Sequence, residues 1–391
     1  MEIVSGKNTS LRDIFKSPAW VSFRKKHFSR IRGDVLDNVE KILICRTNEL
    51  GFATFECECG HSKNLPFTCK SRFCSTCGKI ACDNWMNKVI SWSLPEMQYQ
   101  HIVFTIPEEL RDFLLVNRKE GLDALFTAST KTLLQVFQEK YDCKPGIISV
   151  IHTFGADIKW NPHVHVIVTC GGLSSDKLSW IWSNFLPFKL LRKSWKYNIV
   201  SSLRLWAKST LSDLLYKKFN MFLDFLYKKE WYLNVGKKLE SLEFTIRYIG
   251  RYAKRPVLAE TRLTDFDGVN VSFSFKDKLT QKEKVLTLPV EEFIGKLIRH
   301  IHNKGHRMIR YSGIFASRVK TASLTLVHNL LSSAKQKLIL SPLPITTWRE
   351  RIKLFTGIDP LQCPNCSKIM SLSSISVRLR DGSLKLINFS P

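Results

Sequence analysis

The spacing of hydrophobic residues along this chain alternates between a helical and a strand-like period. Between residues 11 and 45, apolar side chains recur every three or four positions among lysines and arginines, which predicts a pair of helices. Residues 98–106 carry an apolar run that predicts a strand, and a helix is predicted from Pro107, since proline suits a first helical turn. Further elements are expected as helices over about 122–137, 173–235 and 291–318, as a turn at 144–146 and as an edge strand over 269–275. This mixture predicts an α+β fold.

Two apolar runs in the middle of the chain give the clearest strand pattern. Residues 147–151 read Ile-Ile-Ser-Val-Ile, and residues 163–168 read His-Val-His-Val-Ile-Val, with a short turn-forming segment between them. Side chains two positions apart on a strand point to the same face, so His163 and His165 are expected to lie side by side. If the two runs pair as a hairpin, His152 comes close to both.

The three histidines predict a site for a divalent metal ion, because neutral imidazole is a common metal ligand. His163 and His165 are the expected first two ligands, and His152 is preferred over Asp157 as the third. A rival pair, His300 and His302, lies in a helical pattern. Side chains two positions apart on a helix diverge, so this pair is expected to chelate poorly.

Length and charge narrow the class of protein. The chain has 391 residues, 44% of them hydrophobic, which is enough for two or three domains with packed cores. Lysine and arginine number 60 against 34 aspartates and glutamates, a net charge of +26. Such an excess favours a polyanionic partner, above all nucleic acid. No apolar stretch resembles a signal peptide or a transmembrane helix, so a cytoplasmic location and no membrane partner are expected.

The patterns divide the chain into three expected regions. Residues 1–95 hold N-terminal helices and a cysteine-rich segment, and residues 96–278 form a central domain with a helical insertion at about 174–238. Residues 279–391 are expected to be a basic, mostly helical region that ends in a short cysteine motif.

The cysteine-rich segment predicts a structural zinc ribbon. Eleven cysteines in a reducing compartment are better explained as metal ligands than as disulfides. The candidate ligands are Cys57, Cys59, Cys69, Cys74 and Cys77. The Cys-x-x-Cys-Gly pattern makes Cys74 and Cys77 the safest assignments among these ligands. Which four residues bind the ion stays open, and nearby His61 is also a candidate. Whether Cys363 and Cys366 bind a second zinc also stays open, because no other half of such a site is evident.

A pair of tyrosines follows downstream among cations. Tyr248 and Tyr252 are four residues apart, which puts them on one helix face. The cations around them, predicted to contact DNA phosphates, are Arg247, Arg251, Lys254 and Arg255. A tyrosine opposite a metal-polarised phosphodiester can attack the phosphorus, which would leave a 5′-phosphotyrosine and a free 3′-hydroxyl.

These motifs together resemble the HUH endonucleases, and more narrowly the rolling-circle transposases of insertion-sequence family ninety-one. The resemblance rests on motifs spread over most of the chain, namely Cys69-x-x-Arg72-x-Cys74-x-x-Cys77, Phe104-Thr105-Ile106-Pro107, His152-Thr153-Phe154-Gly155, Asn161-Pro162-His163-Val164-His165, Tyr248-Ile249-Gly250-Arg251-Tyr252 and Ile309-Arg310-Tyr311-Ser312-Gly313. It implies a ferredoxin-like HUH nuclease core over 96–278, dependence on magnesium or manganese, and cleavage of single-stranded DNA at transposon ends. The family's paired histidines map to His163 and His165 and its paired tyrosines to Tyr248 and Tyr252.

The resemblance also implies a bacterial or archaeal protein associated with the nucleoid, with target DNA as a second partner. Three alternatives stay open. A plasmid replication initiator or relaxase would share the chemistry, but the cysteine-rich segment argues against it. A non-catalytic zinc-ribbon DNA-binding protein would lack some of the predicted catalytic residues, whereas all of those positions are filled in this sequence. A zinc hydrolase or deaminase would need a glutamate beside the histidines, and the stretch around His163 has none.

Overall fold

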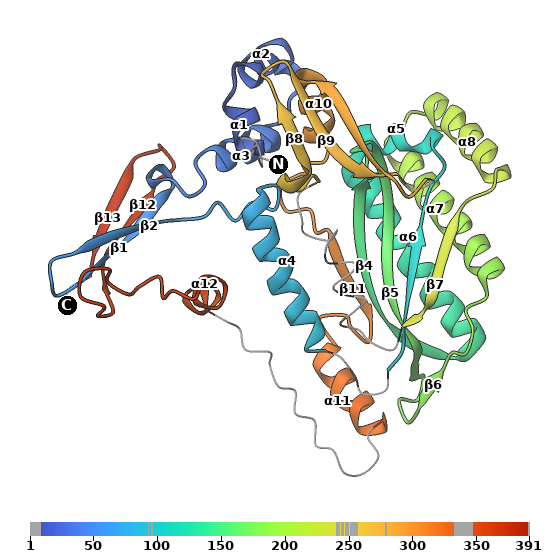
Figure 1. The fold of residues 1–391 in the computed structure, drawn as a ribbon. Coiled ribbons are helices and arrows are strands. Elements are labelled where there is room, and N and C mark those ends of the chain that lie inside the picture. Colours follow the sequence, from blue (N-terminus) through green and yellow to red (C-terminus); the bar gives the residue numbers. More distant parts are fainter. Residues whose placement is uncertain are drawn as a thin grey trace.

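The protein is described here from a computed structural model that covers residues 9–92, 94, 97–239, 243, 246, 250, 257–277, 280–331 and 347–389. Its centre is an antiparallel sheet with the strand order β11-β4-β5-β3-β7 (Figure 1). These strands are β3 (Tyr99–Phe104), β4 (Cys143–Phe154), β5 (Trp160–Ser174), β7 (Leu233–Leu239) and β11 (Ile309–Gly313), and the short β6 (Trp180–Trp182) pairs with β5. The predicted hairpin is thus formed by β4 and β5, the two longest strands.

Alternation along β5 gives the sheet two different faces. Val164, Val166 and Val168 point to one face and pack against helices in the largest hydrophobic cluster. Burial of each such side chain stabilises the fold by about 1.5–3 kcal/mol. The helices on this side are α5 (Glu109–Val116), α6 (Arg118–Tyr141), α7 (Phe188–Thr210) and α8 (Asp213–Lys228). The histidines of β5 alternate with these valines and therefore lie on the opposite face.

The opposite face is covered by two further helices, α4 (Ser75–Ile90) and α11 (Lys320–Leu331). Ile148, Val150 and Ile167 of the sheet pack there against Trp85 and Met86 of α4. Figure 1 shows α4 running beside β11 and β4 on this side of the sheet. The sheet is therefore the middle layer between two sets of helices.

A second body is built from the N-terminal helices and a three-stranded sheet. It contains α1 (Leu11–Lys16), α2 (Pro18–Lys26), α3 (Gly33–Leu43), β8 (Leu263–Phe266), β9 (Asn270–Lys276), β10 (Glu283–Pro289) and α10 (Val290–Ile298), together with the 3₁₀ turns η1 (Phe28–Arg30), η2 (Asn48–Leu50) and η3 (Glu260–Arg262). The strand order β10-β9-β8 puts β9 in the centre, so the expectation of an edge strand over 269–275 was wrong. Alternation alone does not distinguish a central strand from an edge.

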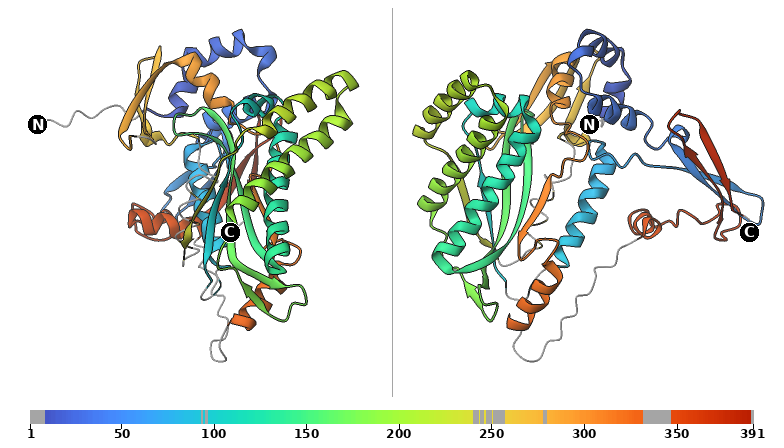
Figure 2. Two further views of the ribbon diagram at one scale, coloured as in Figure 1. Left: turned by 90° about the vertical axis from the view of Figure 1, so that its right-hand side faces the viewer. Right: turned by 180° about the vertical axis from the view of Figure 1, so that it is seen from behind.

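A third sheet joins the two ends of the chain. Its order is β13-β12-β1-β2, in which β1 (Gly51–Glu56) and β2 (Ser62–Pro66) come from the N-terminal part and β12 (Ser371–Arg378) and β13 (Leu384–Asn388) from the C-terminal part. The helix α12 (Trp348–Thr356) precedes these last strands. Figures 1 and 2 show this sheet projecting from the rest of the molecule. The C-terminal region expected to be helical thus contains strands that pair with the N-terminal part.

The expectation of a mixed α+β fold with antiparallel sheets is confirmed. Within the described residues, no helix combines the length and the apolar character needed to cross a membrane.

Candidate metal centres

The β4–β5 hairpin brings the three histidines together. His152 on β4 lies directly opposite His163 on β5, and His165 follows two positions later on the same face. The ligand atoms of all three lie within 4.8 Å of one another. His163 Nε2 and His165 Nε2 are 3.0 Å apart. The structure therefore groups the three residues that the sequence pattern singled out as metal ligands.

Hydrogen bonds orient two of these imidazole rings. His163 Nδ1 lies 2.6 Å from the carbonyl oxygen of Asn161, so Nδ1 carries the proton and donates it, and the lone pair is on Nε2. His165 Nδ1 lies 2.9 Å from His101 Nε2. If His165 Nδ1 donates in this contact, its lone pair is also on Nε2. Both lone pairs then point into the same small space, as metal ligands require.

His101 was not among the residues expected at this site. It lies on β3, which pairs with β5, and its ring stacks parallel to that of His165 with centroids 5.1 Å apart. Burial lowers the pKa of His101 to about 4, so the ring stays neutral and can accept the hydrogen bond. A sequence pattern can place His101 on a strand, but it does not say which strand lies next to it.

The spacing of the two nitrogens tests whether a divalent ion fits. Two lone pairs 3.0 Å apart repel each other unless a cation or a proton lies between them. Metal–nitrogen bonds of about 2.1 Å place neighbouring ligands about 3.0 Å apart in an octahedral site and about 3.4 Å apart in a tetrahedral one. The observed distance therefore allows both nitrogens to bind one divalent ion.

The surroundings keep His152 neutral. Burial lowers the pKa of His152 well below its ordinary value, and the nearby His163, His101 and Arg72 lower it further. A neutral imidazole retains the lone pair that binds a metal ion.

Arg72 is a second residue that the sequence did not single out for this site. It belongs to the cysteine-rich segment, yet its charge helps to lower the pKa values of His152, His302 and His306. Burial is the largest cause of the lowered pKa in all three histidines. Burial lowers the pKa of Arg72 itself to about 10. In the described parts of the chain, no hydrogen bond or ion pair neutralises its guanidinium. A half-buried cation of this kind beside a metal site is suited to binding an anion.

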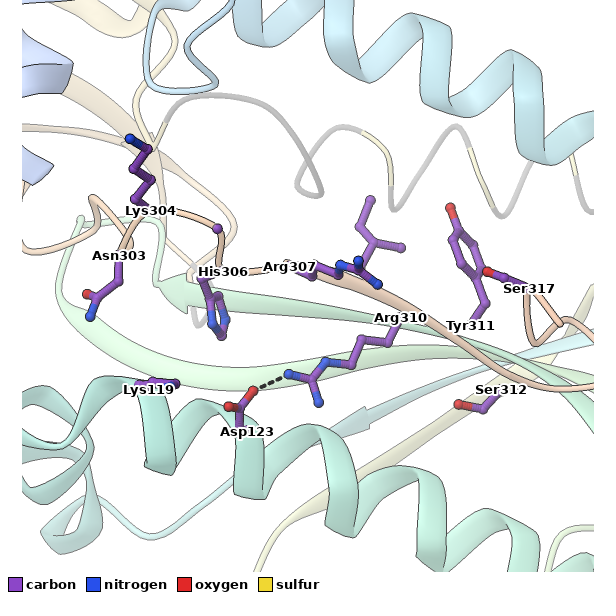
Figure 3. A pocket seen from close by; sticks show the side chains of 12 residues that line it. Lys119, Asp123, Asn303, Lys304, His306, Arg307, Arg310, Tyr311, Ser312 and Ser317 are labelled. Atoms are coloured by element: carbon purple, nitrogen blue, oxygen red, sulfur yellow. Dashed lines mark hydrogen bonds and ion pairs between the residues drawn. The ribbon is translucent and has the colours of Figure 1, made fainter.

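A basic cleft of about 700 Å³ lies between α6 and the segment that leads into β11. Its cationic lining residues are Lys119, Lys304, Arg307 and Arg310, and His306, whose pKa burial lowers, also lines it. Figure 3 shows Arg310 reaching across to Asp123 of α6, with which it forms an ion pair. The His302 and His306 rings stack with centroids 5.5 Å apart. The cleft offers a positively charged surface at the β11 edge of the sheet.

The two alternatives for metal ligands have structural roles instead. His300 is buried beyond the end of α10, where Nδ1 lies 3.0 Å from Thr153 Oγ1 and Nε2 lies 3.0 Å from the carbonyl oxygen of Ile158. Both of its ring nitrogens are therefore used to hold the tip of the β4–β5 hairpin. Asp157 forms an ion pair of 3.3 Å with Lys159 in the same tip. Neither residue belongs to a ligand cluster among the described residues.

The predicted nucleophiles and their cations, Tyr248, Tyr252, Arg247, Arg251, Lys254 and Arg255, lie outside the described residues. Two neighbours of the tyrosines are described. Ile246 is fully buried in the cluster on the histidine face of the sheet. Cys82 Sγ of α4 donates to the carbonyl oxygen of Gly250 at 2.6 Å. A side chain at Gly250 would lie 2.3 Å from Met86 Sδ, so the backbone there packs tightly against α4.

The candidate zinc ligands divide into two clusters of four cysteines. The first contains Cys69, Cys74 and Cys77 together with Cys45, which was not among the candidates. Sγ of Cys45 lies 3.7 Å from Cys77 and 3.8 Å from Cys74. A tetrahedral zinc ion with bonds of about 2.3 Å separates its sulfurs by about 3.8 Å, so this cluster fits zinc.

The other two candidates, Cys57 and Cys59, meet the C-terminal Cys363 and Cys366 in the second cluster. Sγ of Cys57 lies 3.3 Å from Cys366, and Sγ of Cys59 lies 3.6 Å from Cys363. The irregular Cys57-x-Cys59 motif and the C-terminal Cys363-x-x-Cys366 motif are thus neighbours in space, although more than three hundred residues separate them in the sequence.

Two parts of the chain match known protein families. Residues 15–106 match the family described as "Transposase zinc-binding domain", and residues 146–323 match the family described as "Putative transposase". The chain is 31% identical over 352 residues to the transposase for insertion sequence element IS801 of Pseudomonas savastanoi pv. phaseolicola, across 87% of this chain and 83% of that relative. It is 30% identical over 345 residues to the putative transposase y4qJ of Sinorhizobium fredii, across 83% and 85% of the two chains. No solved structure matches the chain.

Proposed function

Because the chain belongs to the transposases of insertion-sequence family ninety-one, we propose that it cuts and rejoins single-stranded DNA through a 5′-phosphotyrosine intermediate. The observation that carries this proposal is the histidine cluster, in which His163 Nε2 and His165 Nε2 lie 3.0 Å apart beside His152. These three residues would hold a magnesium or manganese ion. A bound ion would polarise the scissile phosphodiester and offset the negative charge that develops on it.

The proposed nucleophiles are Tyr248 and Tyr252. The tyrosine oxygen bonds to phosphorus while the bond from phosphorus to the 3′ oxygen breaks, and the proton that the tyrosine loses is balanced by one that the 3′ oxygen gains. The phosphate then links the 5′ end of the strand to the protein. Attack by a free 3′-hydroxyl on this linkage reverses the step and joins strands. Two tyrosines allow two strands to be held at once.

The positions of Ile246 and Gly250, two described neighbours of the tyrosines, support this assignment. Ile246 packs in the hydrophobic cluster that also contains Ile167, two positions after His165 on β5. Gly250, between the two tyrosines in sequence, is held against α4 on the same side of the sheet. Ile246 and Gly250, the described neighbours of the proposed nucleophiles, therefore lie on the face that carries the proposed metal ligands.

The DNA contacts that we propose are electrostatic. The basic cleft beside β11 would take the phosphates of a single strand, and Arg72 would contact the phosphate that reacts. The cations around the tyrosines, Arg247, Arg251, Lys254 and Arg255, would hold neighbouring phosphates. Contacts of this kind are strongest at low salt.

Cleavage of labelled single-stranded oligonucleotides from the element's ends tests the proposed function. With magnesium or manganese, we expect a covalent protein–DNA band on a denaturing gel and a free 3′-hydroxyl fragment. Without metal, both products should be absent. DNA binding with no covalent band under any metal would instead support a non-catalytic DNA-binding protein.

His101 provides a specific prediction about metal affinity. The His101→Ala variant removes the acceptor that orients His165 Nδ1, so we expect manganese to bind about 10–100-fold more weakly. Cleavage at saturating manganese should fall much less. The His101→Gln variant can still accept this hydrogen bond and should recover most of the affinity. Titration calorimetry with manganese measures the effect, and an unchanged dissociation constant for His101→Ala would exclude the role.

Arg72 provides a second prediction, about rate rather than metal affinity. In the Arg72→Gln variant, loss of a cation that stabilises the reacting phosphate is expected to slow cleavage about 10²–10³-fold at saturating DNA and metal. Zinc content and manganese affinity should not change. Arg72→Lys should recover part of the rate because the charge remains. A cleavage rate within threefold of the unmodified protein would show that Arg72 does not contact the reacting group.

A further inference from the structure

We propose that Cys57, Cys59, Cys363 and Cys366 bind a second structural zinc ion, which fastens the C-terminal segment to the N-terminal hairpin. The family match to a zinc-binding domain ends at residue 106, and the transposase match ends at residue 323. The two C-terminal ligands lie beyond both. The proposal therefore adds a metal site, and a role for the end of the chain, to the proposed nuclease function and does not depend on it.

Each half of the site is a tight turn that directs two thiols the same way. In the N-terminal half, Cys57 N donates to the carbonyl oxygen of His61 at 2.9 Å, and Gly60 N donates to that of Cys57 at 2.9 Å. Gly60 has a φ of 84°, a conformation that favours glycine. The two thiols of this half come from Cys57 and Cys59, on either side of one residue.

The C-terminal half repeats this construction. Cys363 N donates to the carbonyl oxygen of Lys368 at 2.8 Å, and Ser367 N donates to that of Cys363 at 2.9 Å. Ser367 takes the left-handed conformation with a φ of 60°. The bridge between Gln362 and Ile369 closes the turn. Two turns of this type facing each other form the usual framework of a four-cysteine zinc site.

The sulfur positions agree with a metal ion and not with disulfides. The cross-cluster distances of 3.3 Å, from Cys57 to Cys366, and 3.6 Å, from Cys59 to Cys363, lie near the value of about 3.8 Å for a tetrahedral zinc site. A disulfide would bring two sulfurs to about 2.05 Å. An ion pair of 2.7 Å between Lys368 and Glu58 joins the two turns beside the cluster.

Among the described residues, the sheet around the cluster has no hydrophobic core that could replace a metal ion. Its buried hydrophobic cluster consists of Cys57, Cys363 and Met370, with Phe55 packed against them. All residues of β13 are exposed. Regions this small and this poorly packed are generally held together by metal ions or disulfides. Zinc binding would thus supply most of the stability that keeps β12 paired with β1.

The site also determines where the end of the chain lies. With β12 held on β1, Arg378 forms an ion pair of 3.0 Å with Glu40 of α3. Arg351 of α12 donates to Asn84 Oδ1 of α4 at 2.9 Å. Without the zinc ion, we expect the C-terminal strands to separate from β1 and these contacts to be lost.

Zinc content and hydrogen exchange of the full chain test the proposal. Elemental analysis of the unmodified protein should give two zinc ions per chain, and the Cys363→Ser/Cys366→Ser variant should give one. The Asn365→Ala variant, altered in the same turn but not at a ligand, should retain two. In the double serine variant, amides of β1 and β12 should exchange at least about tenfold faster, while those of β4 and β5 should be unchanged.

Unchanged exchange in β4 and β5 would show that the double serine variant remains folded. One zinc ion in the unmodified protein, two in the double serine variant, or unchanged exchange in β1 and β12 would each overturn the proposal. Four thiols that resist alkylation after denaturation and chelation, until a reductant is added, would show disulfides in place of zinc.

Discussion

Replacing both His163 and His165 by alanine is expected to lower metal-dependent cleavage of single-stranded DNA by at least about 10³-fold. The two Nε2 atoms lie 3.0 Å apart, a spacing at which both can bind one divalent ion. His152 alone cannot retain the ion at ordinary concentrations. The charge that develops on the phosphate would then be offset only by protein cations, and electrostatic stabilisation is commonly the largest catalytic contribution.

The measurement is a single-turnover cleavage assay with labelled oligonucleotides, run beside manganese titrations. A matched control is His27→Ala, since His27 ends α2 and does not belong to the histidine cluster. This control should cleave at the rate of the unmodified protein, and both variants should bind DNA. A double alanine variant that cleaves within a few-fold of the unmodified rate would contradict the assignment of the metal site.

Replacing both Tyr248 and Tyr252 by phenylalanine is expected to abolish the covalent protein–DNA product completely. Phenylalanine keeps the shape of the side chain but lacks the hydroxyl oxygen that forms the bond to phosphorus. DNA binding and manganese affinity should stay within about threefold, because neither the basic cleft nor the histidine cluster is altered. Each single variant should still form some product through the remaining tyrosine.

The assay compares covalent bands on a denaturing gel for the two single variants and the double variant. Tyr232→Phe is the matched control, because Tyr232 is exposed beside β7 and has no proposed role. It should form the covalent product normally. A covalent product in the double phenylalanine variant would show that another residue is the nucleophile.

The sequence was sufficient to predict the hairpin and its histidines, because both depend on local alternation. Apolar and polar positions alternate along β5, and β4 follows the helix that covers the same sheet, so pairing of the two strands was the simplest arrangement. The turn expected at 144–146 was wrong, since these residues begin β4. Gly146 lies against the ring of Phe315, so the glycine there permits close packing and not a turn.

The rest of the candidate site depends on contacts between distant segments. His101 reaches His165 only because β3 lies next to β5, and strand order cannot be read from local patterns. Arg72 belongs to a cysteine motif whose position relative to the central sheet is set by tertiary packing.

The cysteine clusters depend even more on contacts between segments that are distant in the sequence. Cys45 follows α3 with no second cysteine nearby in sequence, so nothing in its local pattern indicates a ligand. Cys363 and Cys366 lie close to Cys57 and Cys59 only because strands from the two ends of the chain form one sheet. Spacing rules identify half-sites, whereas the pairing of half-sites is a property of the fold.

Peptide mapping of the covalent product tests the central claim most directly. The protein is incubated with an oligonucleotide from the element's end and manganese, digested with protease and nuclease, and analysed by mass spectrometry. We predict a nucleotide joined through its 5′ phosphate to Tyr248 or Tyr252, present only with metal. Cleaved DNA with no attached peptide, or a nucleotide attached to any other residue, would contradict the account.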